Sequence, residues 1–335
     1  MASVKIWFQA LRTIPRVSKE EWQDLDVVAK YLISSRSAVF LMTALSAGIG
    51  GILAYRDGSF DWLVFLAAMF GLIFAHASNN LINDYVDHKR GIDKDNYYRS
   101  QYGPQPMEHG LMTRGELFRY IGFSLLVAVG LGIFLVAQTS MITLVLMGVG
   151  LFFVFFYTWP LKYIGLGEPS VVVIWGPLMV GGTYLVLTGT WSWEVALIAL
   201  IYALGPTSVL FGKHTDKLKE DRKKGVHTLP VILGERAARY VNIGNWVAQY
   251  LLVIGLVAYQ VLTPVMLVVV LALPKFLSTA RIYAKPRPES APPDLQPGVW
   301  PLYLSAHAFQ YNKRFGGLFL LALIAETVLV RTGVL

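Results

Sequence analysis

Long apolar segments separated by shorter polar ones dominate the chain. A helix needs roughly 20 residues to cross the hydrocarbon core of a bilayer, and nine segments approach that length. The uncharged stretch 120–161 is too long for one helix, and Gln138-Thr139-Ser140 provide the natural break between two. The pattern therefore predicts an all-α, polytopic membrane bundle of nine transmembrane helices. The expected spans lie near residues 37–55, 62–83, 116–137, 141–159, 170–188, 194–211, 239–259, 263–281 and 315–333.

The composition supports a membrane protein, with 55% hydrophobic residues, 15% charged residues and a mean hydropathy of +0.52. The absence of cysteine excludes disulfides, thiolate metal sites and cysteine nucleophiles. No signal peptide pattern follows Met1, so the first span is expected to direct insertion. Residues 1–36 carry Trp7, Phe8 and Trp22 among Lys and Arg, which suits a segment on an anionic membrane surface. We expect residues 1–36 to be interfacial and residues 37–335 to form a single transmembrane domain.

The basic residues fall on alternate connections between the nine spans. One side of the membrane receives 26 of the 29 Lys and Arg residues. Because cytoplasmic loops carry the excess of positive charge, the N-terminus is expected in the cytoplasm and the C-terminus outside the cell membrane. Topology thus accounts for the formal charge of +8, and no nucleic-acid partner is expected. The long connections 84–119, 212–240 and 281–315 lie on the cytoplasmic side, where we expect the chemistry.

The stretch NLINDYVDHKRGID (80–93) ends the second apolar span abruptly with acids and amides. On a helix, Asn80, Asn83, Asp84 and Asp87 stand on one face because they are spaced by three and four residues. Such oxygen donors suit Mg²⁺ better than a softer metal. The alternative is a polar helix end that faces water.

A second acidic cluster ends another apolar span and contains Asp216, Glu220 and Asp221. Asp216 and Glu220 are four residues apart and Asp221 is close, so either Glu220 or Asp221 is a candidate second ligand. Two acidic clusters on one membrane face suggest a shared Mg²⁺ site, and Mg²⁺ holds phosphates through bridging oxygens. Basic residues near the clusters would complete a diphosphate site, although each can also be a simple topology charge. The candidates are Lys89, Arg90, Arg99, Lys162, Lys213 and Lys217.

Four segments in order resemble the UbiA superfamily of intramembrane prenyltransferases, and the resemblance covers most of the chain from about residue 30. The stretch 80–93 is similar to the first aspartate-rich motif of that family, and DKLKEDRKKGVHTLPVILG (216–234) is similar to the second. YTWPLKYIGLGE (157–168) and RSQYGPQPMEHGLMT (99–113) are similar to segments of the menaquinone-type branch, MenA.

The sequence departs from the family at two places. The second motif of the family usually has two Asp four residues apart, whereas here Asp216 is displaced by one residue. The Arg that MenA-like proteins tend to carry after Gly-Pro is absent, and Gln105-Pro106 stand near its place. The displaced Asp216 bears on which acids are metal ligands, and the absent Arg bears on which acceptor is used.

The resemblance implies a UbiA-like fold and Mg²⁺-dependent transfer of a polyprenyl group from an allylic prenyl diphosphate to an aromatic acceptor, with release of pyrophosphate. For the MenA branch it implies 1,4-dihydroxy-2-naphthoate as acceptor, in menaquinone biosynthesis; a hydroxybenzoate, homogentisate, a chlorophyllide or a lipid alcohol are the alternatives. The expected partners are polyprenyl diphosphate, the aromatic acceptor and the lipid bilayer. The implied catalytic residues are Asp84, Asp87, Asp216 and Asp221; the metal ligands are these four with Asn80 and Glu220; the substrate-binding residues are Asn83, Lys89, Arg90, Arg99, Tyr157, Lys162, Tyr163, Lys213 and Lys217.

Aromatic faces near these motifs, at Tyr85, Phe156, Tyr157 and Trp159, would tolerate an allylic cation, or else form an interfacial aromatic belt. The main rival from another class is a transporter, because intramembrane acids and amides often mark ion paths. Transporters tend to place their sites near the midplane between repeats, whereas these polar groups gather at helix ends and no clear inverted repeat is seen.

Two charged residues, Lys275 and Glu326, lie well inside the expected spans rather than at their ends. Lys275 is close enough to a span end to snorkel to the interface. Glu326 lies deeper in the last span, and the sequence does not indicate its partner.

Overall fold

The structure is a computed structural model that describes residues 2–95, 98, 103–293, 295–296 and 298–334. The described residues form helices, with one isolated β-bridge between Ile164 and His227, so the all-α prediction is confirmed. The chain divides into two compact units. The first comprises Met1–Leu45 and Leu66–Trp159, and the second comprises Ser46–Phe65 and Pro160–Leu335. Each unit is described by itself.

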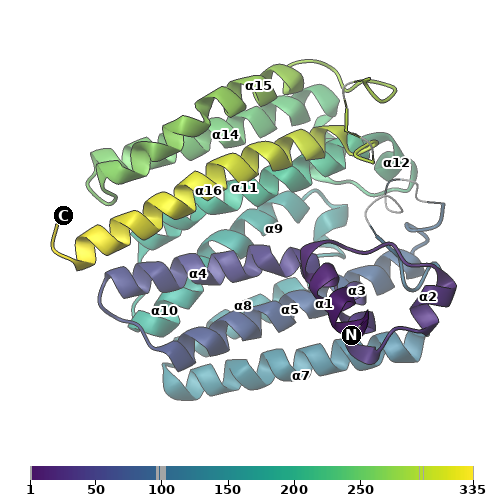
Figure 1. The fold of residues 1–335 in the computed structure, drawn as a ribbon, viewed down its shortest axis with the longest axis horizontal. Coiled ribbons are helices and arrows are strands. Elements are labelled where there is room, and N and C mark those ends of the chain that lie inside the picture. The colour runs from purple at the N-terminus through teal and green to yellow at the C-terminus, as the bar shows by residue number, and fades with distance from the viewer. Residues whose placement is uncertain (1, 96–97, 99–102, 294, 297, 335) are drawn as a thin grey trace. The chain divides into compact units, whose positions relative to one another are not determined.

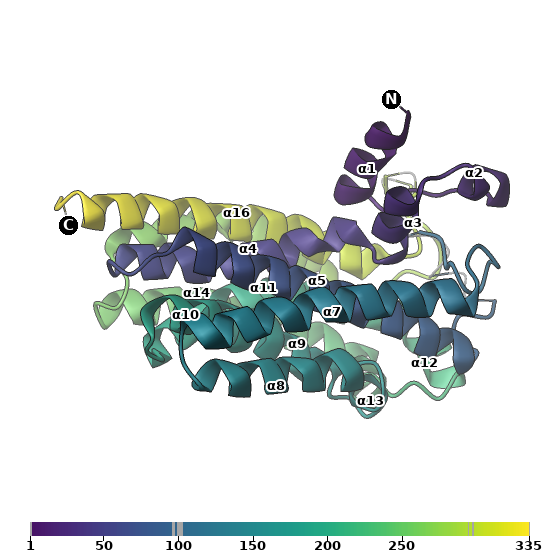
Figure 2. The same ribbon diagram turned by 90° about the horizontal axis from the view of Figure 1, so that it is seen from below.

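In the first unit, short helices at the N-terminus precede the long apolar ones (Figure 2), and α7 packs along α8. A capping box, made of two reciprocal hydrogen bonds, fixes where α7 begins. The Thr113 hydroxyl accepts a hydrogen bond from Glu116 N–H (3.2 Å), while the Glu116 carboxylate accepts from Thr113 N–H (2.8 Å). This unit contains α1 (Ala2–Arg12), α2 (Lys19–Gln23), α3 (Val27–Ser34), η1 (Ser37–Val39), α7 (Arg114–Gln138), α8 (Ile142–Phe156), the start of α4 (Phe40–Arg56) and most of α5 (Trp62–Lys89).

The core of the first unit joins the N-terminal segment to the long helices. Trp22 is only 4% exposed and belongs to the same buried cluster as Ile33, Leu81 and Leu117. We expected Trp22 to face a membrane surface, and this was wrong because its ring is part of the protein core. Phe8, at 61% exposed, keeps the environment expected of an interfacial residue.

The second unit is built around α11 (Trp193–Asp216), which packs against α14 (Glu235–Ala258), α16 (Tyr303–Arg331) and α9 (Gly167–Val173) (Figure 1). Small residues allow the close approach, since a Cβ at Gly212 would lie 2.6 Å from the Tyr283 hydroxyl. Its remaining elements are η2 (Leu161–Tyr163), η3 (Ile174–Gly181), α10 (Gly182–Thr188), α12 (Leu218–Lys223), α13 (Leu229–Leu233), η4 (Pro264–Ala272) and α15 (Leu273–Tyr283).

The segment α9–η3–α10 is one apolar span with a kink. Gly176 has non-helical torsion angles (φ −95°, ψ −108°), and Pro177 follows it without an N–H group to donate. The Trp175 carbonyl beside the kink accepts a hydrogen bond from the Ser46 hydroxyl (3.1 Å). A kink in a membrane span is tolerated where a neighbouring side chain satisfies the backbone in this way.

Seven helices of the described chain are long and apolar enough to cross a membrane, and they coincide with seven of the nine expected spans. The span expected at 141–159 is a shorter apolar helix, Ile142–Phe156, and the span expected at 315–333 falls on the later part of α16, which ends at Arg331. The expected break at Gln138-Thr139-Ser140 is confirmed, because α7 ends at Gln138 and α8 begins at Ile142.

The two intramembrane charges have definite partners. The Glu326 carboxylate pairs with Arg56 (3.3 Å) and accepts hydrogen bonds from the Thr263 N–H (3.0 Å) and hydroxyl (2.9 Å). Glu326 is therefore a structural anchor within the second unit. The Lys275 ammonium donates to the Gln310 amide oxygen (2.7 Å), so its charge is held at an exposed position.

Candidate functional site

The first acidic cluster occupies the last turns of α5 in the first unit. Asn80, Asp84 and Asp87 are each less than 9% exposed, which confirms that they share one buried face. The Asn80 amide donates to the Ser35 carbonyl (2.9 Å). The Asn83 amide donates to the Asp87 carboxylate (3.2 Å) and the Thr158 hydroxyl (3.2 Å). These bonds orient the amide nitrogens toward protein acceptors and leave the amide oxygens as acceptors themselves.

A guanidinium that the sequence pattern did not identify completes this cluster. Arg36 forms an ion pair with the Asp84 carboxylate and donates from both terminal nitrogens to the Asn83 amide oxygen (3.2 Å each). Its backbone lies in the left-handed region (φ 57°, ψ 49°), which costs an L-residue about 1–2 kcal/mol. Strain of this kind is often found at functional sites. The sequence offers only one signal for Arg36, its position at the entry to the first span.

The donor set of the first cluster fits Mg²⁺. Mg²⁺ prefers hard oxygen ligands and is usually held by one or two carboxylates together with substrate phosphates. The described residues contain no group of three or more His, Cys, Asp or Glu side chains that would hold a metal ion, so amide oxygens must contribute. Asp84, Asp87 and the Asn80 amide oxygen provide this combination on one helix face.

Other predicted residues of the first unit lie apart from the acidic face or have other contacts. Lys89 is exposed, Tyr157 is half-buried at the end of α8, and Arg99 lies outside the described residues. The Arg90 guanidinium lies over the Trp159 ring, 5.0 Å from its centre. This contact uses one face of an aromatic ring that we expected near an allylic cation.

The ring of Tyr85, like that of Trp159, is covered by an arginine. The Arg114 guanidinium stacks on its ring (5.2 Å) and donates to its hydroxyl (2.6 Å). Phe156 is 44% exposed. These environments favour the alternative interpretation of the aromatic residues as an interfacial belt.

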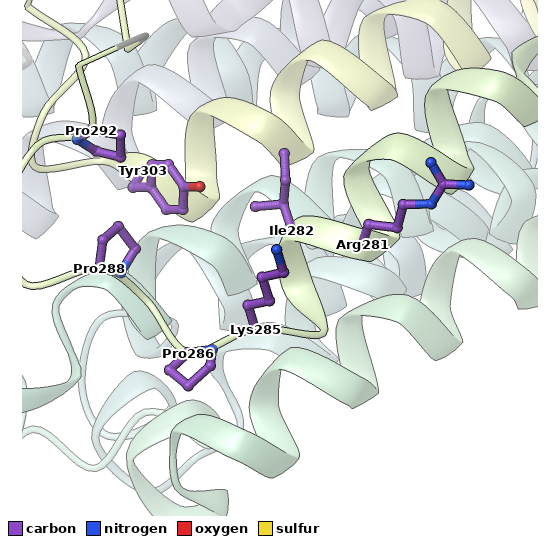
Figure 3. A pocket seen from close by; sticks show the side chains of 7 residues that line it. All are labelled: Arg281, Ile282, Lys285, Pro286, Pro288, Pro292 and Tyr303. Atoms are coloured by element: carbon purple, nitrogen blue, oxygen red, sulfur yellow. The ribbon is translucent and has the colours of Figure 1, made fainter.

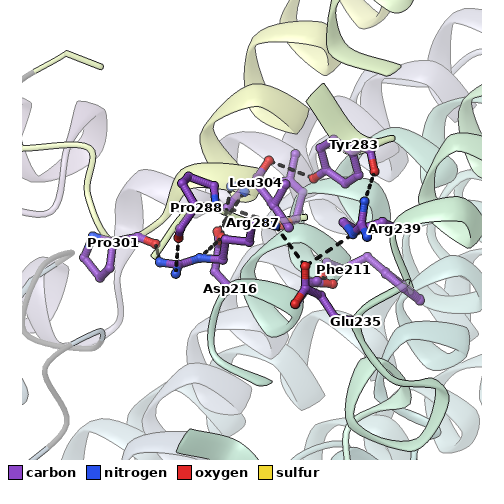
Figure 4. A network of polar contacts seen from close by, with 12 residues as sticks. Phe211, Asp216, Glu235, Arg239, Tyr283, Arg287, Pro288, Pro301 and Leu304 are labelled. Atoms are coloured by element: carbon purple, nitrogen blue, oxygen red, sulfur yellow. Dashed lines mark hydrogen bonds and ion pairs between the residues drawn. The ribbon is translucent and has the colours of Figure 1, made fainter. Parts of the chain in front are cut away.

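In the second unit, Asp216 ends α11 and is fully occupied by protein donors (Figure 4). One carboxylate oxygen accepts from Arg287 Nε (2.9 Å) and Leu304 N–H (3.0 Å), and the other accepts from Ser305 N–H (3.0 Å). The two N–H groups belong to the first turn of α16, where backbone donors lack intrahelical partners. Asp216 thus caps α16 and ties it to the proline-rich segment that carries Arg287.

Arg287 is itself held on several sides. It donates from Nη2 to the Pro301 carbonyl (2.7 Å), and its backbone N–H donates to the Glu235 carboxylate (2.9 Å). Its guanidinium also stacks on Trp300, 4.3 Å from the ring centre. Arg287 thereby fixes its part of the connection between α15 and α16 to the end of α11.

The other acids of the second cluster lie on α12. The Lys217 ammonium pairs with the Asp221 carboxylate (3.2 Å), and both side chains are at most 10% exposed. The Glu220 carboxylate has a buried oxygen without a hydrogen-bond partner in the described part of the chain. Lys213 is half-buried on the last turn of α11.

Residues 164–168 are bonded to the second motif through side chains that we had not singled out. The Glu168 carboxylate pairs with His214 (2.5 Å) and accepts from Leu229 N–H (3.3 Å), while Ile164 forms the isolated β-bridge with His227. Within the second unit this places η2, which carries Lys162 and Tyr163, against the second motif. The signal for Glu168 in the sequence was an acid directly after a Gly-rich turn.

A separate pocket of about 290 Å³ opens between the end of α15 and the start of α16 (Figure 3). Lys285 and Arg281 line it together with Tyr303 and several prolines. The pocket contains no carboxylate or amide side chain, so it lacks ligands for Mg²⁺. Its lining does not include any predicted site residue.

Comparisons with known proteins agree with these features. The profile of the UbiA prenyltransferase family matches residues 40–295. The chain is 26% identical to 1,4-dihydroxy-2-naphthoate octaprenyltransferase of Bacillus subtilis (strain 168), over 68% of this chain and 73% of that protein. It is 32% identical to the protein of the same name from Escherichia coli (strain K12), over 65% and 72%. It is 28% identical to UbiA prenyltransferase domain-containing protein 1 of Gallus gallus, and the match spans 62% of each chain.

A solved structure shows the same fold at low sequence identity. The UbiA homolog from Archaeoglobus fulgidus bound to GPP and Mg²⁺ superimposes with a TM-score of 0.56 at 14% identity, covering 87% of this chain and 99% of that one. The apo UbiA homolog from Aeropyrum pernix K1 also gives a TM-score of 0.56, at 15% identity and over 88% and 96% of the two chains.

Proposed function

Because the chain belongs to the UbiA prenyltransferase family, we propose that it transfers a polyprenyl group from an allylic prenyl diphosphate to an aromatic acceptor and releases pyrophosphate. The observation that carries the proposal is the acidic face of α5, where Asp84 and Asp87 lie buried with two oriented amides and the Arg36 guanidinium pairs with Asp84 and Asn83. Membrane insertion follows from its long apolar helices.

Asn80, Asp84 and Asp87 would hold Mg²⁺ on this face. When bound, Mg²⁺ supplies positive charge that stabilises the pyrophosphate leaving group. The Arg36 guanidinium presents paired N–H donors, which match phosphate oxygens better than a single ammonium does. We assign it to the diphosphate as well, with Asn83 as the acceptor that orients it.

Basic residues of the second unit are candidates as well. Lys162 lies beside the buried Tyr163 ring, with its ammonium 5.6 Å from the ring centre, in the segment that Glu168 bonds to the second motif. We propose Lys162 and Lys213 as phosphate ligands. Of the acids there, Asp221 is a candidate for holding the Lys217 ammonium, whereas the contacts of Asp216 favour a structural role. Lys89 and Arg90 stay weaker candidates because of their exposure.

We propose 1,4-dihydroxy-2-naphthoate as the acceptor and a long polyprenyl diphosphate as the donor, with demethylmenaquinone and carbon dioxide as products. Support comes from the two bacterial relatives whose names specify this acceptor. Gln105 replaces the expected Arg and is 3% exposed, and its amide nitrogen has no hydrogen-bond partner in the described part of the chain. A buried unpaired donor is costly, and an oxygen of the acceptor would satisfy it.

The proposed orientation places the N-terminus and both acidic clusters in the cytoplasm and the C-terminus outside. It rests on the 26 of 29 basic residues that fall on one side of the nine expected spans. Reporter fusions test it: a reporter after Leu335 should register the external side, and one within 284–293 the cytoplasmic side. A cytoplasmic C-terminus would reduce the number of spans by one.

The experiment that tests the function uses purified protein in detergent with Mg²⁺ and geranylgeranyl diphosphate, offered each acceptor separately. We expect a lipid-soluble prenylated naphthoquinol from dihydroxynaphthoate and pyrophosphate release that stops when Mg²⁺ is chelated. Turnover with another acceptor alone would contradict the MenA assignment. No pyrophosphate release with any acceptor would contradict the enzyme and favour a transporter.

A further inference from the structure

The second acidic cluster has the right residue types for a divalent cation, but its geometry does not fit one. Asp216 is the first reason. Its side chain has no exposed surface, and both of its oxygens accept hydrogen bonds from Arg287 and the first turn of α16 (Figure 4). A metal ion could bind this carboxylate only if Arg287 and two backbone N–H groups lost their acceptor, which is costly for buried groups.

Lys217 is the second reason. It occupies the position four residues before Asp221, where a second carboxylate would be needed to share a cation with it. The ammonium instead pairs with Asp221 at 3.2 Å, and Asp221 N–H donates to the Lys217 carbonyl (2.9 Å). Because both residues lie on one helical turn, the ammonium stays near the carboxylate, and a divalent cation at Asp221 would be repelled by it.

Glu220 does not supply the second carboxylate that would have to share a cation with Asp221. It is the neighbour of Asp221 on α12, and adjacent helical residues project in directions about 100° apart. Lys213, in contrast, lies four residues before Lys217 and shares its side of the chain. Lys217 is therefore a cation where a second carboxylate would be needed, and two lysines spaced by one helical turn suit an anion better than a metal ion.

We propose that the second cluster of this protein is a phosphate-binding site built on the Lys217 ammonium, which takes the place of a second divalent cation. The inference rests on the proposed function, since the phosphate it would bind is the diphosphate of the prenyl donor. Asp221 acts as a positioning residue that holds the ammonium in place. The protein therefore needs one divalent cation, bound at Asp84 and Asp87 on α5.

The test is a count of bound Mn²⁺ per chain by electron paramagnetic resonance, on the full protein in detergent with pyrophosphate as the probe. We expect one bound Mn²⁺ for the wild type and two for Lys217→Asp, because the substitution places two carboxylates four residues apart. Lys219→Asp is the matched control; Lys219 is exposed on the same short helix, and its variant should still bind one. Two Mn²⁺ in the wild type, or one in a folded Lys217→Asp, would overturn the proposal.

A second variant covers the case in which Lys217→Asp does not fold. Lys217→Met removes the charge but keeps the length of the side chain, and it should weaken pyrophosphate binding about tenfold, the loss expected for one charge-assisted hydrogen bond, without changing the Mn²⁺ count. Unchanged pyrophosphate affinity would contradict the phosphate role. These measurements need no acceptor, so a failure of the proposed prenyl transfer would appear separately, as absent product from the wild type.

Discussion

In the first acidic cluster, the Asp84 carboxylate pairs with the Arg36 guanidinium, which comes from the turn before η1, 48 residues earlier in the chain. In the second cluster, the charge on Asp221 is met by an ammonium from the same helical turn, and Asp216 is bound by Arg287 and two backbone N–H groups. The first cluster has two carboxylates and two amides on one helix, and its cation contacts one of each, Asp84 and Asn83. In the second, each of Asp216 and Asp221 has a cation of its own.

This difference separates acids that can act on a ligand from acids that maintain the fold. Arg36 comes from a different element than Asp84, and the Asn83 amide oxygen gives its guanidinium a second acceptor beside the acidic face. Lys217 cannot move far from Asp221, and a divalent ion 4 Å from an ammonium is repelled by about 8 kcal/mol at an effective dielectric constant of about 20. We therefore locate the metal chemistry in the first cluster and treat the acids of the second as structural or positioning groups.

The largest expected effect is that of Asp84→Asn. Loss of one metal-binding carboxylate should reduce kcat by about a thousandfold, since charge stabilisation by the metal is worth several kcal/mol in the transition state. Because Arg36 also loses its buried ion pair, some loss of stability is expected, and the rates are compared at a temperature where the variant stays folded. Pyrophosphate release measures the rate, and Glu289→Gln, at an exposed acid of the proline-rich segment, is the control. A rate within a few-fold of the wild type would mean that Asp84 does not hold the metal.

Asp216→Ala tests the structural role that we assign to the second acidic cluster. The substitution leaves Arg287 largely buried without its carboxylate and removes the cap of α16, so we expect a loss of stability of about 3 kcal/mol. The measurement is the unfolding temperature of the detergent-solubilised protein. If Asp216→Ala kept the wild-type stability and lost turnover, Asp216 would be a catalytic ligand and the assignment of the second cluster would be wrong.

A smaller effect is expected at Arg36. Arg36→Ala should raise the KM for the prenyl diphosphate about 30-fold, because a charge-assisted bidentate contact is worth about 2 kcal/mol. Arg36→Lys keeps the charge but not the fork of donors, and it should recover only part of the loss. Steady-state kinetics with varied donor concentration measure both. Full recovery by Lys would show that the fork geometry is unimportant.

The smallest effect is expected at Lys162. Lys162→Ala should raise the KM for the donor about fivefold and lower kcat modestly, since one exchangeable phosphate contact is lost. Lys275→Ala is the matched control, because this lysine donates to Gln310 at an exposed position away from the second motif. Equal effects of the two substitutions would show that the segment 157–168 has no special part in donor binding.

The sequence predicted those features that depend on local spacing. The break between α7 and α8, and the common face of Asn80, Asp84 and Asp87, follow from helix periodicity and from uncharged length. For the second cluster, the sequence predicted which residues belong to it but not what they do. Spacing suggested that Asp216 was available to a metal, and only the fold shows that α16 begins against it.

The missed residues have partners that are distant in the chain. Arg36 and Asp84 are 48 residues apart, Glu168 and His214 are 46 apart, and Arg287 and Asp216 are 71 apart. No periodic pattern reports such pairs, because each depends on how separate helices pack. Lys217 was different: its place in the sequence, four residues before Asp221, was visible, but it was interpreted only as a basic residue near phosphate.

The location of the metal is the central claim, and pulsed electron paramagnetic resonance of bound Mn²⁺ tests it most directly. With a prenyl thiolodiphosphate in the sample, the wild type should show Mn²⁺ coupled to phosphorus. The coupling should vanish in the double variant Asp84→Asn, Asp87→Asn and persist in Asp221→Asn. Persistence in the double variant, or loss in Asp221→Asn with the analogue still bound, would contradict the account.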